Sequence, residues 1–512
     1  MKTVASRLIP RLRCLAFCGA LGLLPGCMSA LDNAPSSPSK PWVPQSERKD
    51  DGSALPPPAG AADFGVPPVA QAAMREAPPT IRREKSYSLP ELIDLAQQRN
   101  PATRVAWQAA RQAALGQGMV EATYLPLITA SVLAGHQEVK QSLPVEVGNI
   151  RSVKTTLGGV SPQIAMQWLV FDFGQRSALA AAAKHNATAA NVLFNGLHQK
   201  IIADVTRAYF LYGAARAQVR VAGQALANAQ EINNAAEARL KAGRGTTVET
   251  AQARQQLAQA KYGKVQAEGN ERLAYQALLG AMGLPPETVI RIDDPSRRPL
   301  PGSVATPTEQ VIRSALARRP DVLASYSAMK ASQAGVAAAR AEFLPKVYLG
   351  AMAATGSSDL SAGNLPGIGQ QASSAGILIG ATVPIFDGGL RRNQLKNAQS
   401  VADAAQATFQ QTQETAAREI FMAATTLQSA LASYQAASEL VRAAQVSYDA
   451  TLESYRAGVG TVDVAAAAST ALLEARRAQS DAHAASLVAA ANLAFALGSM
   501  TSADVPLGLM GR

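Results

Sequence analysis

The side chains that most often carry out chemistry are few in this chain, and their spacing does not suit catalysis. Its 512 residues include four histidines and three cysteines. The histidines lack the paired spacing of a metal site; they are His136, His185, His198 and His483. We also find no nucleophile motif and no phosphate loop in the sequence. We therefore predict no catalytic site, no metal site, no cofactor and no enzymatic activity.

Two glycine pairs, Gly243-x-Gly245 and Gly458-x-Gly460, share part of the pattern of a nucleotide-binding loop. Neither pair has the third glycine or the βαβ context that a dinucleotide site requires. We interpret both as turns between helices. The basic residues form no cluster, so nucleic acid is not an expected partner.

Cys27 is the one cysteine whose surroundings indicate a chemical role. Four basic residues precede an apolar run from Cys14 to Leu24, which is typical of an export signal and too short to span a bilayer. The next residues, Leu24-Pro25-Gly26-Cys27, resemble a bacterial lipobox, whose cysteine is acylated after cleavage. Removing the four basic residues lowers the net charge from +11 to +7. The alternative is cleavage after Ala30, in which case Cys27 is lost.

Residues 27–87 have the composition of a lipid-anchored, proline-rich linker. Stretches such as PSSPSKPWVP and ALPPPAG hold Pro, Ser and Ala with few large apolar residues. Such a segment cannot bury enough apolar surface to fold. We therefore expect an extended tether between a lipid anchor and a folded body.

From about Ser88 onward the chain consists of two similar sequence repeats. Phe171-Asp172-x-Gly174 recurs in the second half as Phe386-Asp387-x-Gly389. Two more pairs recur at the same or nearly the same displacement: Gly243-x-Gly245-Thr246 with Gly458-x-Gly460-Thr461, and Tyr124-Leu125-Pro126 with Phe343-Leu344-Pro345. Such self-similarity marks a tandem repeat. The predicted domains are a signal peptide (1–26), the linker (27–87), a first repeat (88–300), a second repeat (301–500) and a C-terminal tail (501–512).

Each repeat is predicted to hold one antiparallel pair of strands. Alternation of apolar and polar residues marks strand rows that begin near Ile128, Ile164, Val347 and Ile377. The stretches between paired strands are polar and glycine-rich, so we expect exposed loops near Val145–Gly158 and Ser357–Ser374. A soluble sandwich edge is the alternative, although four strands among so much helix leave no second sheet to pack on.

The helical signal is stronger than the strand signal. The whole stretch from Leu390 to Ala457 lacks Gly and Pro, and as a helix it would span about 100 Å. Apolar residues recur there at heptad spacings, at Ile420, Leu427, Leu431, Tyr434, Val441, Tyr448, Leu452 and Tyr455. The first repeat carries this register at Val205, Tyr212, Val219, Leu226 and Leu240, interrupted at Asn233. Each repeat should therefore form a long helical hairpin that needs neighbours to cover it.

This combination resembles the TolC family of outer-membrane efflux proteins, the outer-membrane factors, in a lipoprotein form. The resemblance runs from Ser88 to about Gly498. It is carried by the YLP or FLP marker, the strand pair, the FDxG junction, the long alanine-rich helix, a YxAGxGT-like tip and a terminal LG or MG. It implies a mainly α protein with a membrane β-barrel, in which three copies close 12 strands, continued by a long α-helical barrel across the periplasm.

Physical reasoning alone supports part of this assembly. Open sheet edges are not tolerated in lipid, so four strands cannot span a membrane as a monomer. Two copies or three would both close a barrel, and only the resemblance sets the number at three. The implied function is a passive outer-membrane duct of a tripartite efflux or type I secretion system. Its implied partners are a periplasmic adaptor, an inner-membrane pump and outer-membrane lipid; the alternative is a structural or adhesive, lipid-anchored periplasmic coiled-coil protein.

The resemblance also implies roles for single residues. Six of them would form the strand-to-helix junctions, with glycine allowing the bend and Asp capping the helix: Phe171, Asp172, Gly174, Phe386, Asp387 and Gly389. Tyr455, Asp463 and Glu249 would form a gate at the periplasmic end, with Tyr455 hydrogen-bonding near Glu249. Alternatively, Tyr455 is only the last heptad contact, and both acids are solvated charges that the helix dipole favours.

Overall fold

The computed structural model describes residues 84–147, 150–295, 298–362 and 368–500. By its internal contacts the chain divides into a unit at Met1–Pro79 and a unit at Thr80–Arg512, and every described element belongs to the second. Cys27, almost all of the predicted linker and the predicted tail at 501–512 therefore lie outside the described residues. Short pieces of both predicted loops lie outside them as well.

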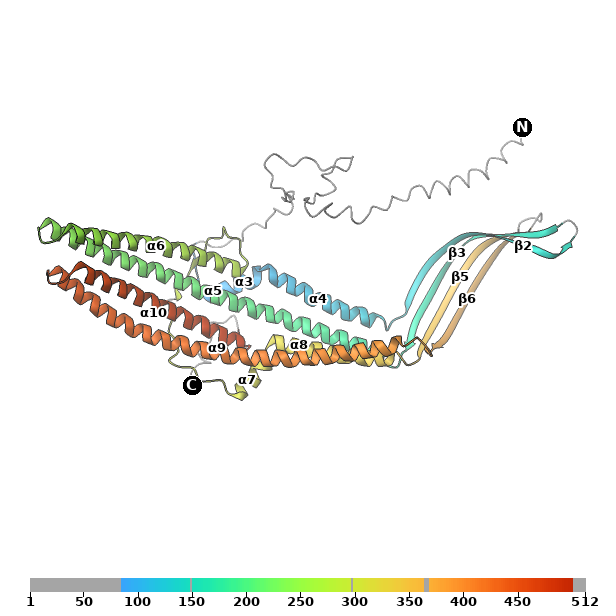
Figure 1. Ribbon diagram of the computed structural model, residues 1–512. Helices are drawn as coiled ribbons and strands as arrows, with labels where there is room; N and C mark the ends of the chain where they lie inside the picture. The colour runs from blue at the N-terminus through green and yellow to red at the C-terminus, as the bar shows by residue number, and fades with distance from the viewer. Residues whose placement is uncertain (1–83, 148–149, 296–297, 363–367, 501–512) are drawn as a thin grey trace, which may run out of the picture. The chain divides into compact units, whose positions relative to one another are not determined.

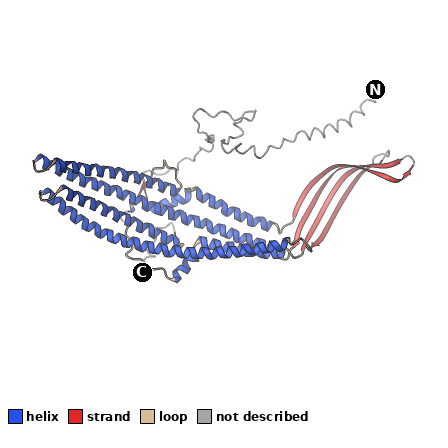
Figure 2. Ribbon diagram, viewed as in Figure 1, coloured by secondary structure: helices blue, strands red, loops and turns tan. Residues whose placement is uncertain are grey.

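The described elements follow the same order twice. The first repeat contains α4 (Pro101–Ala122), β2 (Leu127–Val147), β3 (Ile150–Phe171), α5 (Gln175–Lys241) and α6 (Thr247–Met282). The second contains α8 (Pro320–Ala341), β5 (Lys346–Ala362), β6 (Ile368–Thr382), α9 (Leu390–Arg456) and α10 (Val462–Ala496). Shorter elements precede α4 and α8: α3 (Leu89–Arg99), α7 (Glu309–Leu316) and the parallel pair β1 (Ser86–Tyr87) and β4 (Arg291–Ile292). Figure 2 shows the four long strands together, away from the helical turns.

The two longest helices, α5 and α9, have 67 residues each, about 100 Å. Shorter helices fill the space beside them. Near the strands, α4 packs on α5, and α8 packs on both α5 and α9. Toward the turns, α6 replaces α4 and α10 replaces α8 in the same positions (Figure 1). The α4 and α6 flank and the outer flank of α9 are thus two open edges of one wall. None of the described helices combines the length and the apolar character that crossing a bilayer requires.

Buried side chains collect in clusters along these helices. A middle cluster joins α3, α5 and α6 through residues such as Leu92, Val205 and Leu278. A second cluster, which we name the tip core, lies near the helical turns. The tip core consists of Ile232, Ala236, Ala253, Tyr448, Leu452, Tyr455, Val462, Ala465, Ala468 and Leu472. Its small alanines let neighbouring helices approach one another closely.

The segment that follows β4 crosses α5 and reaches α10. Pro295 approaches α5 so closely that a Cβ at Gly213 would lie 2.1 Å from the proline ring. Arg216 on α5 donates a hydrogen bond to a backbone carbonyl of β4 at 2.9 Å. His483 on α10 hydrogen-bonds the carbonyl of Arg298 at 2.9 Å. This crossing segment therefore ties the first helical hairpin to the second.

The last helix of each repeat ends against the start of that repeat's α4 or α8. Asn100 caps α4 and donates to a carbonyl at the end of α6 at 3.2 Å. Arg319 at the start of α8 donates to a carbonyl at the end of α10, also at 3.2 Å. Gly283 and Gly498 follow the two helices with φ of 70° and 65°. A Cβ at Gly283 would lie 2.8 Å from the Asn100 Cα, so only glycine fits this contact.

The long strands form one antiparallel sheet in the order β2-β3-β5-β6. One face is apolar across all four strands, because the register aligns Ile128, Met166, Ala351 and Ile377 in one row. The next row on this face holds Ala130, Ile164, Ala353 and Ala375. The opposite face is mixed; one of its rows holds Ser131, Gln163, Ala354 and Ser374. The strand rows predicted from alternation therefore share one face, as expected for a sheet with one apolar side.

The predicted loops at Val145–Gly158 and Ser357–Ser374 are wrong in extent, because most of these residues belong to strands. β2 pairs with β3 out to Val147 and Ile150, and β5 pairs with β6 out to Leu360 and Ile368. The backbone ladder continues where the apolar alternation stops, since pairing uses backbone groups and not side chains. The polar residues therefore mark where the surroundings of the strands change, and they do not mark where the strands end.

We expect Gly283→Ala to lower the free energy of unfolding by about 2 kcal/mol, because alanine is strained at a φ of 70° and its Cβ meets Asn100. Thermal unfolding in detergent measures the change. Gly223→Ala is the matched control, since nothing lies within 4 Å of its Cβ. This control should be neutral or should stabilise α5 by about 0.5 kcal/mol. Equal effects of the two substitutions would contradict the close contact at Gly283.

Candidate functional site

β3 passes into α5 through a buried ion pair. Asp172 follows the last residue of β3 and is 5% exposed. Its carboxylate accepts hydrogen bonds from the backbone N–H groups of Gly174 (3.2 Å) and Arg176 (3.0 Å), and from the Arg176 Nε at 2.8 Å. The other guanidinium nitrogens donate to the carbonyls of Thr123 at 3.0 Å and Val170 at 3.2 Å. Asp172 thus caps α5, while Arg176 joins α4, β3 and α5.

The charge state of this pair follows from its surroundings. Burial alone would raise the pKa of Asp172. Hydrogen bonds and the positive charge of Arg176 outweigh burial and lower the pKa of Asp172 below its ordinary value of 3.8. The Arg176 guanidinium also lies 4.9 Å from the ring centre of Tyr124. Asp172 is therefore charged at neutral pH, and its hydrogen bonds hold the Arg176 side chain in place.

β6 passes into α9 through a similar but more exposed arrangement. Asp387 accepts hydrogen bonds from the backbone N–H groups of Gly389 at 3.0 Å and Arg391 at 3.1 Å. The Arg391 guanidinium lies 3.1 Å from the same carboxylate, with both side chains about a quarter exposed. The hydrogen bond from the Arg391 N–H is the main cause that lowers the pKa of Asp387. The preceding Ile385 and Phe386 are 93% and 91% exposed.

The glycine of each FDxG motif occupies a conformation that other residues rarely adopt. Gly174 and Gly389 have φ of 93° and 90°, in the left-handed region, and each immediately precedes a long helix. Phe171 and Phe173 lie beside the first junction with their rings 4.6 Å apart, edge to face. The structure thus places Phe171 at the end of β3 and the other five junction residues between a strand and a helix, at the same end of the sheet.

Each helical hairpin reverses direction at one of the two glycine pairs. Gly243 and Gly458 have φ of 65° and 84°. A Cβ at Gly245 or Gly460 would lie 3.0 Å from a backbone nitrogen of the helix before the turn. The next helix begins directly after the second glycine, with a threonine as its N-cap. The prediction that both glycine pairs are turns between helices is confirmed.

Tyr455 is fully buried in the tip core, one turn before the second reversal. Arg239 of the first repeat lies over its ring, with the guanidinium carbon 5.0 Å from the ring centre. The Arg239 Nη1 donates to the Tyr455 carbonyl at 3.1 Å, and its Nη2 donates to the Arg244 carbonyl at 3.4 Å. Arg239 therefore fixes the turn of its own hairpin and holds the adjacent hairpin beside it.

The two predicted gate acids lie in the first turns of α6 and α10. Glu249 forms a capping box with Thr246, in which each backbone N–H donates to the other's side chain. Asp463 is exposed at the start of α10. Burial raises the pKa of Tyr455, and the negative charge of Glu249 raises it further. Among the described residues, however, the Tyr455 hydroxyl has no hydrogen-bond partner, so the expected bond near Glu249 is not formed.

Several contacts at the tip were not identified from the sequence. Glu231 on α5 forms an ion pair with Arg456 on α9. Glu237 on α5 forms another with Arg254 on α6, at 3.2 Å. Neither glutamate has a charged counterpart at the equivalent position of the second repeat, so the comparison of repeats that found the other sites does not find these. Their only sequence signal is the cluster of charges within a few turns of the glycine pairs.

Unpaired buried polar atoms also gather near the helical turns. Seven buried side-chain atoms within the described ranges have no hydrogen-bond partner, and five of these lie near the tip. The five are Asn233 Oδ1, Arg239 Nε, Gln256 Oε1, Tyr448 OH and Tyr455 OH. Each unpaired buried group destabilises the packed state by about 1–3 kcal/mol. The tip is therefore a weaker interface than its apolar core alone would indicate.

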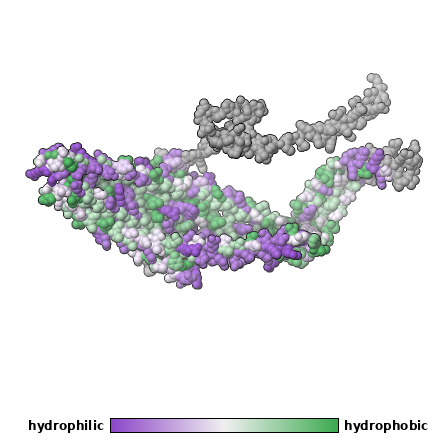
Figure 3. All heavy atoms as spheres, in the orientation of Figure 1, coloured by the Kyte–Doolittle hydropathy of each residue, from purple (hydrophilic) through white to green (hydrophobic). Residues whose placement is uncertain are grey.

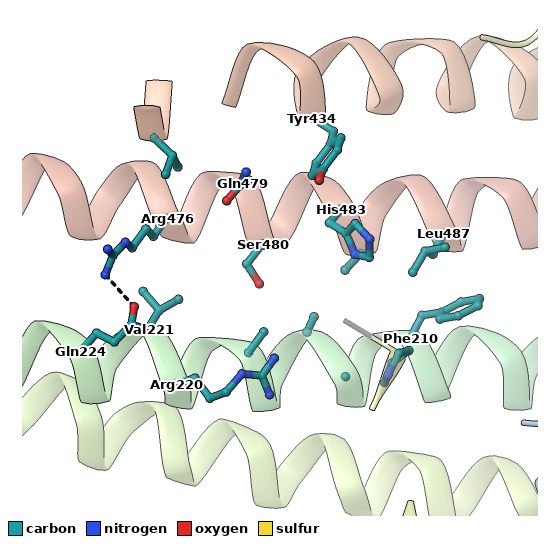
Figure 4. A pocket seen from close by; sticks show the side chains of 16 residues that line it. Phe210, Arg220, Val221, Gln224, Tyr434, Arg476, Gln479, Ser480, His483 and Leu487 are labelled. Carbon is teal, nitrogen blue, oxygen red and sulfur yellow. Dashed lines mark hydrogen bonds between the residues drawn. The ribbon is translucent and has the colours of Figure 1, made fainter. Parts of the chain in front are cut away.

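A cavity of about 410 Å³ lies between α5, α9 and α10 near the crossing segment. Figure 4 shows Arg476 pointing toward Gln224, to which it donates at 2.6 Å, and His483 close to Tyr434. A second guanidinium nitrogen of Arg476 donates to Gln445 at 2.6 Å. The bond to Gln224 connects the two hairpins, whereas the bond to Gln445 lies within the second hairpin. In the described part of the chain, no three His, Cys, Asp or Glu side chains are grouped to hold a metal ion.

We expect Asp172→Asn to lower the free energy of unfolding by about 3 kcal/mol, because it leaves the buried Arg176 without its counterion. Asp387→Asn is the matched control and should cost less, since that pair is more exposed. Because folding lowers the pKa of Asp172, its stabilisation is complete above pH 3.8 and is lost as the pH falls through the lower folded value. Thermal unfolding at pH 7 and at pH 3 measures both effects, and equal losses at both sites would contradict them.

Comparisons with known proteins agree with this arrangement. The family model described as outer membrane efflux protein matches residues 92–284 and 311–499, one match for each repeat. Protein CyaE of Bordetella pertussis is 28% identical over 365 residues, which cover 70% of this chain and 73% of CyaE. Outer membrane protein OprJ of Pseudomonas aeruginosa is 27% identical over 65% of this chain and 67% of OprJ.

The fold is also shared with solved structures. A membrane protein from Pseudomonas aeruginosa superimposes with a TM-score of 0.69 at 24% identity, over 80% of this chain and 93% of that one. At this identity the likeness shows the fold, and the family follows from the model match to both repeats. The chain belongs to the outer membrane efflux protein family.

Proposed function

We propose that three copies of this chain form a passive duct from the periplasm to the exterior. In this proposal the three sheets close a 12-stranded barrel in the outer membrane, and the helices close a tunnel beneath it. The observation that carries the proposal is a sheet with an apolar band across one face, in which no described strand pairs with the outer edges of β2 and β6. The proposed partners are a periplasmic adaptor protein and an inner-membrane pump.

The outer edges of β2 and β6 argue against a single copy of this sheet in lipid. In lipid, every backbone N–H and C=O group needs a partner within the protein, so an open sheet edge is excluded. β2 and β6 lie at opposite edges of the same antiparallel sheet. The β6 edge of one copy can therefore pair with the β2 edge of the next, and head-to-tail repetition closes a ring.

The apolar face has the height of a membrane barrel. Along β2 the apolar row runs from Ile128 to Ala134, and on the same face His136 begins a polar stretch. These seven residues of strand rise about 23 Å, close to the apolar band of about 25 Å in outer-membrane barrels. Figure 3 shows this change, from apolar near the helices to polar toward the far end of the sheet. The remaining length of the strands would project beyond the membrane.

Aromatic side chains gather where the sheet meets the helices. Seven of the chain's 25 aromatic residues lie there: Tyr124, Trp168, Phe171, Phe173, Phe343, Tyr348 and Phe386. All except Trp168 are exposed in the single chain. Such girdles mark the interface between a barrel and the lipid headgroups. This grouping supports a membrane boundary at the FDxG junctions, with the helices on the periplasmic side.

The helical tip is the proposed gate. Arg239 binds both the ring and the backbone of Tyr455, so it links the first hairpin to the second where the tunnel would narrow. The unpaired polar atoms nearby reduce the cost of separating the hairpins. Asp463 would contribute one exposed acid per copy, and three copies would form a ring that attracts cations.

Acylated Cys27 would anchor the duct in the outer membrane, and residues 28–87 would connect this anchor to the first repeat. The anchor adds a second attachment to a body that the barrel already holds. A structural or adhesive coiled-coil protein is not favoured, because such a protein has no use for a four-stranded sheet with an apolar face. Membership in the outer membrane efflux protein family favours the duct for the same reason.

A planar-bilayer recording tests the duct and its gate together. Purified protein should run as a trimer in mild detergent and should conduct ions at low basal level. Arg239→Gln should raise single-channel conductance several-fold, because it removes the cation from the Tyr455 ring and weakens the link between hairpins. Asp463→Asn should lower cation selectivity in the same recording.

Tyr455→Phe is the matched control for this experiment. The hydroxyl it removes is buried without a partner, so conductance should stay at the wild-type level and thermal stability should not fall. A protein that neither trimerises nor conducts contradicts the duct. A conducting trimer whose Arg239→Gln variant matches wild type contradicts only the gate.

The anchor has its own test. Cys27→Ser should abolish metabolic labelling with palmitate, because the acylated sulfur and the new amino terminus are lost together. Trimers should still form and fractionate with the outer membrane, since insertion depends on the barrel and not on the lipid. Labelling that persists in the variant would exclude Cys27 as the attachment site.

A further inference from the structure

We propose that ion pairs across the seam between copies, from α4 of one copy to α9 of the next, set the register of the helical wall. The occupant of each open flank is thus a second copy of this chain. This inference rests on the proposed assembly and adds to it the groups that align neighbouring copies. It comes from charges at the two open edges that have no ion-pair partner among the described residues.

The two edges begin at the same level of the molecule. The end of α4 leads into β2, and the end of β6 leads into α9. β2 starts four residues farther from the helices than β6 ends, because the register places Leu127 level with Leu378 and Lys346 level with Thr382. The helix ends do meet at one level: the start of α5 contacts the residues that follow both α4 and α8, through the bonds from Arg176 to Thr123 and from Gln175 to Glu342. If β6 of one copy pairs with β2 of the next, α9 of the first must lie beside α4 of the second.

Charges of opposite sign stand at this level on the two flanks. Glu121 lies directly before the last residue of α4, and Arg392 and Lys396 lie in the first two turns of α9. At 1.5 Å per residue these positions are about 2 Å, 3 Å and 9 Å from their helix ends. All three side chains are exposed. Long side chains readily bridge such differences in height.

A second pair of opposite charges lies farther from the sheet in the same order. Arg111 lies in the middle of α4, and Asp403 lies on α9 beyond Lys396. Their heights above the helix ends are about 16 Å and 20 Å. On α9, the helical period places Arg392, Lys396 and Asp403 on one face of the helix. Moving away from the sheet, the charge therefore changes from negative to positive on α4 and from positive to negative on α9, and the two changes occur at similar heights.

The charges nearest the sheet are unfavourable within their own chain. α9 has no acid in its first turn and begins with Arg391 and Arg392, although the start of a helix disfavours cations. α4 has no base in its last turn and ends with Glu121, although the end of a helix disfavours anions. Arg391 binds Asp387, but in the described part of the chain Arg392, Lys396 and Asp403 have no ion pair or hydrogen bond. A neighbouring copy would offset both unfavourable placements at once.

Apolar side chains flank the same level. Leu125 and Leu127 beside the start of β2 are 70% and 61% exposed, and Ile385 and Phe386 beyond β6 are more exposed still. A lipid headgroup could pair with the bases of α9, but it would leave Glu121 unexplained. A second copy accounts for both signs and for the apolar side chains beside them.

Charge reversal with rescue tests the seam. Glu121→Arg alone and Arg392→Glu alone should each shift the trimer to monomer ratio toward monomer by roughly tenfold in mild detergent, because like charges then face each other at three seams. The double variant should recover most of the trimer. Arg111→Glu and Asp403→Arg should behave in the same way. Glu309→Arg should leave the ratio unchanged, because this exposed residue lies on α7, which packs on α9 near Ile420, about 26 Å beyond Asp403.

A chemical cross-link provides the independent measurement. Glu121→Cys combined with Lys396→Cys should give covalently linked copies with a short bis-maleimide. Glu121→Cys combined with Glu414→Cys should not, because Glu414 lies about 27 Å farther along α9. If wild type is trimeric but reversals have no effect and the first pair does not link, the seam is wrong and the duct stands.

The other outcomes are equally decisive. If Arg392→Glu weakens the trimer, is not rescued by Glu121→Arg, and reduces the phospholipid that co-purifies, the bases bind lipid phosphate and the seam is wrong. If wild type is monomeric in every detergent that keeps it folded, the proposed duct fails, and the seam fails with it. Recovery in the double variant together with the specific cross-link supports the seam.

Discussion

The constraint on which the rest of this structure depends is the hydrogen bonding of two strand edges. A four-stranded sheet leaves the outer backbone groups of β2 and β6 without partners, and lipid offers none. Closing those edges requires further copies, and this in turn fixes where the helices of each copy must stand. Because α4 precedes β2 and α9 follows β6, the proposed closure would bring two helical flanks together below the sheet. One backbone requirement therefore determines both the barrel and the tunnel of the proposed duct.

The two repeats have kept their geometry while exchanging the residues that hold it. The contact between the last helix and the start of α4 or α8 is made by Asn100 in the first repeat and by Arg319 in the second. The Asp172 and Arg176 pair is buried at the first junction, whereas Asp387 and its arginine remain partly exposed at the second. Glycine is retained at equivalent turns, because φ near +60° to +90° admits few other residues. Backbone conformation is thus the stricter constraint, and side-chain partners are exchangeable within it.

Sequence periodicity predicted the helices whose buried side chains are large, apolar and regularly spaced. Six of the eight heptad residues on α9 are buried, since that helix packs on neighbours along most of its length. On α5 only Val205 of the five predicted residues is buried. The buried stripe of this helix near the tip consists instead of Ala229, Ile232, Asn233 and Ala236. Small residues carry little hydropathy signal even when they form the contact. The strand ends and Arg239 were missed because backbone pairing and contacts between hairpins leave no local pattern, whereas Tyr455 was found through its heptad position.

The crossing segment has a mechanical consequence for the tip. Pro295 packs closely against α5 at Gly213, and the helix then continues without a break to Lys241. At 1.5 Å per residue the part beyond this contact is a stiff lever of about 42 Å. A rotation of about 5° around the Pro295 contact would carry its end through about 4 Å, more than the diameter of a water molecule, about 2.8 Å. In the proposed duct, such a rotation would move the tip of the first hairpin while the strands stay in place.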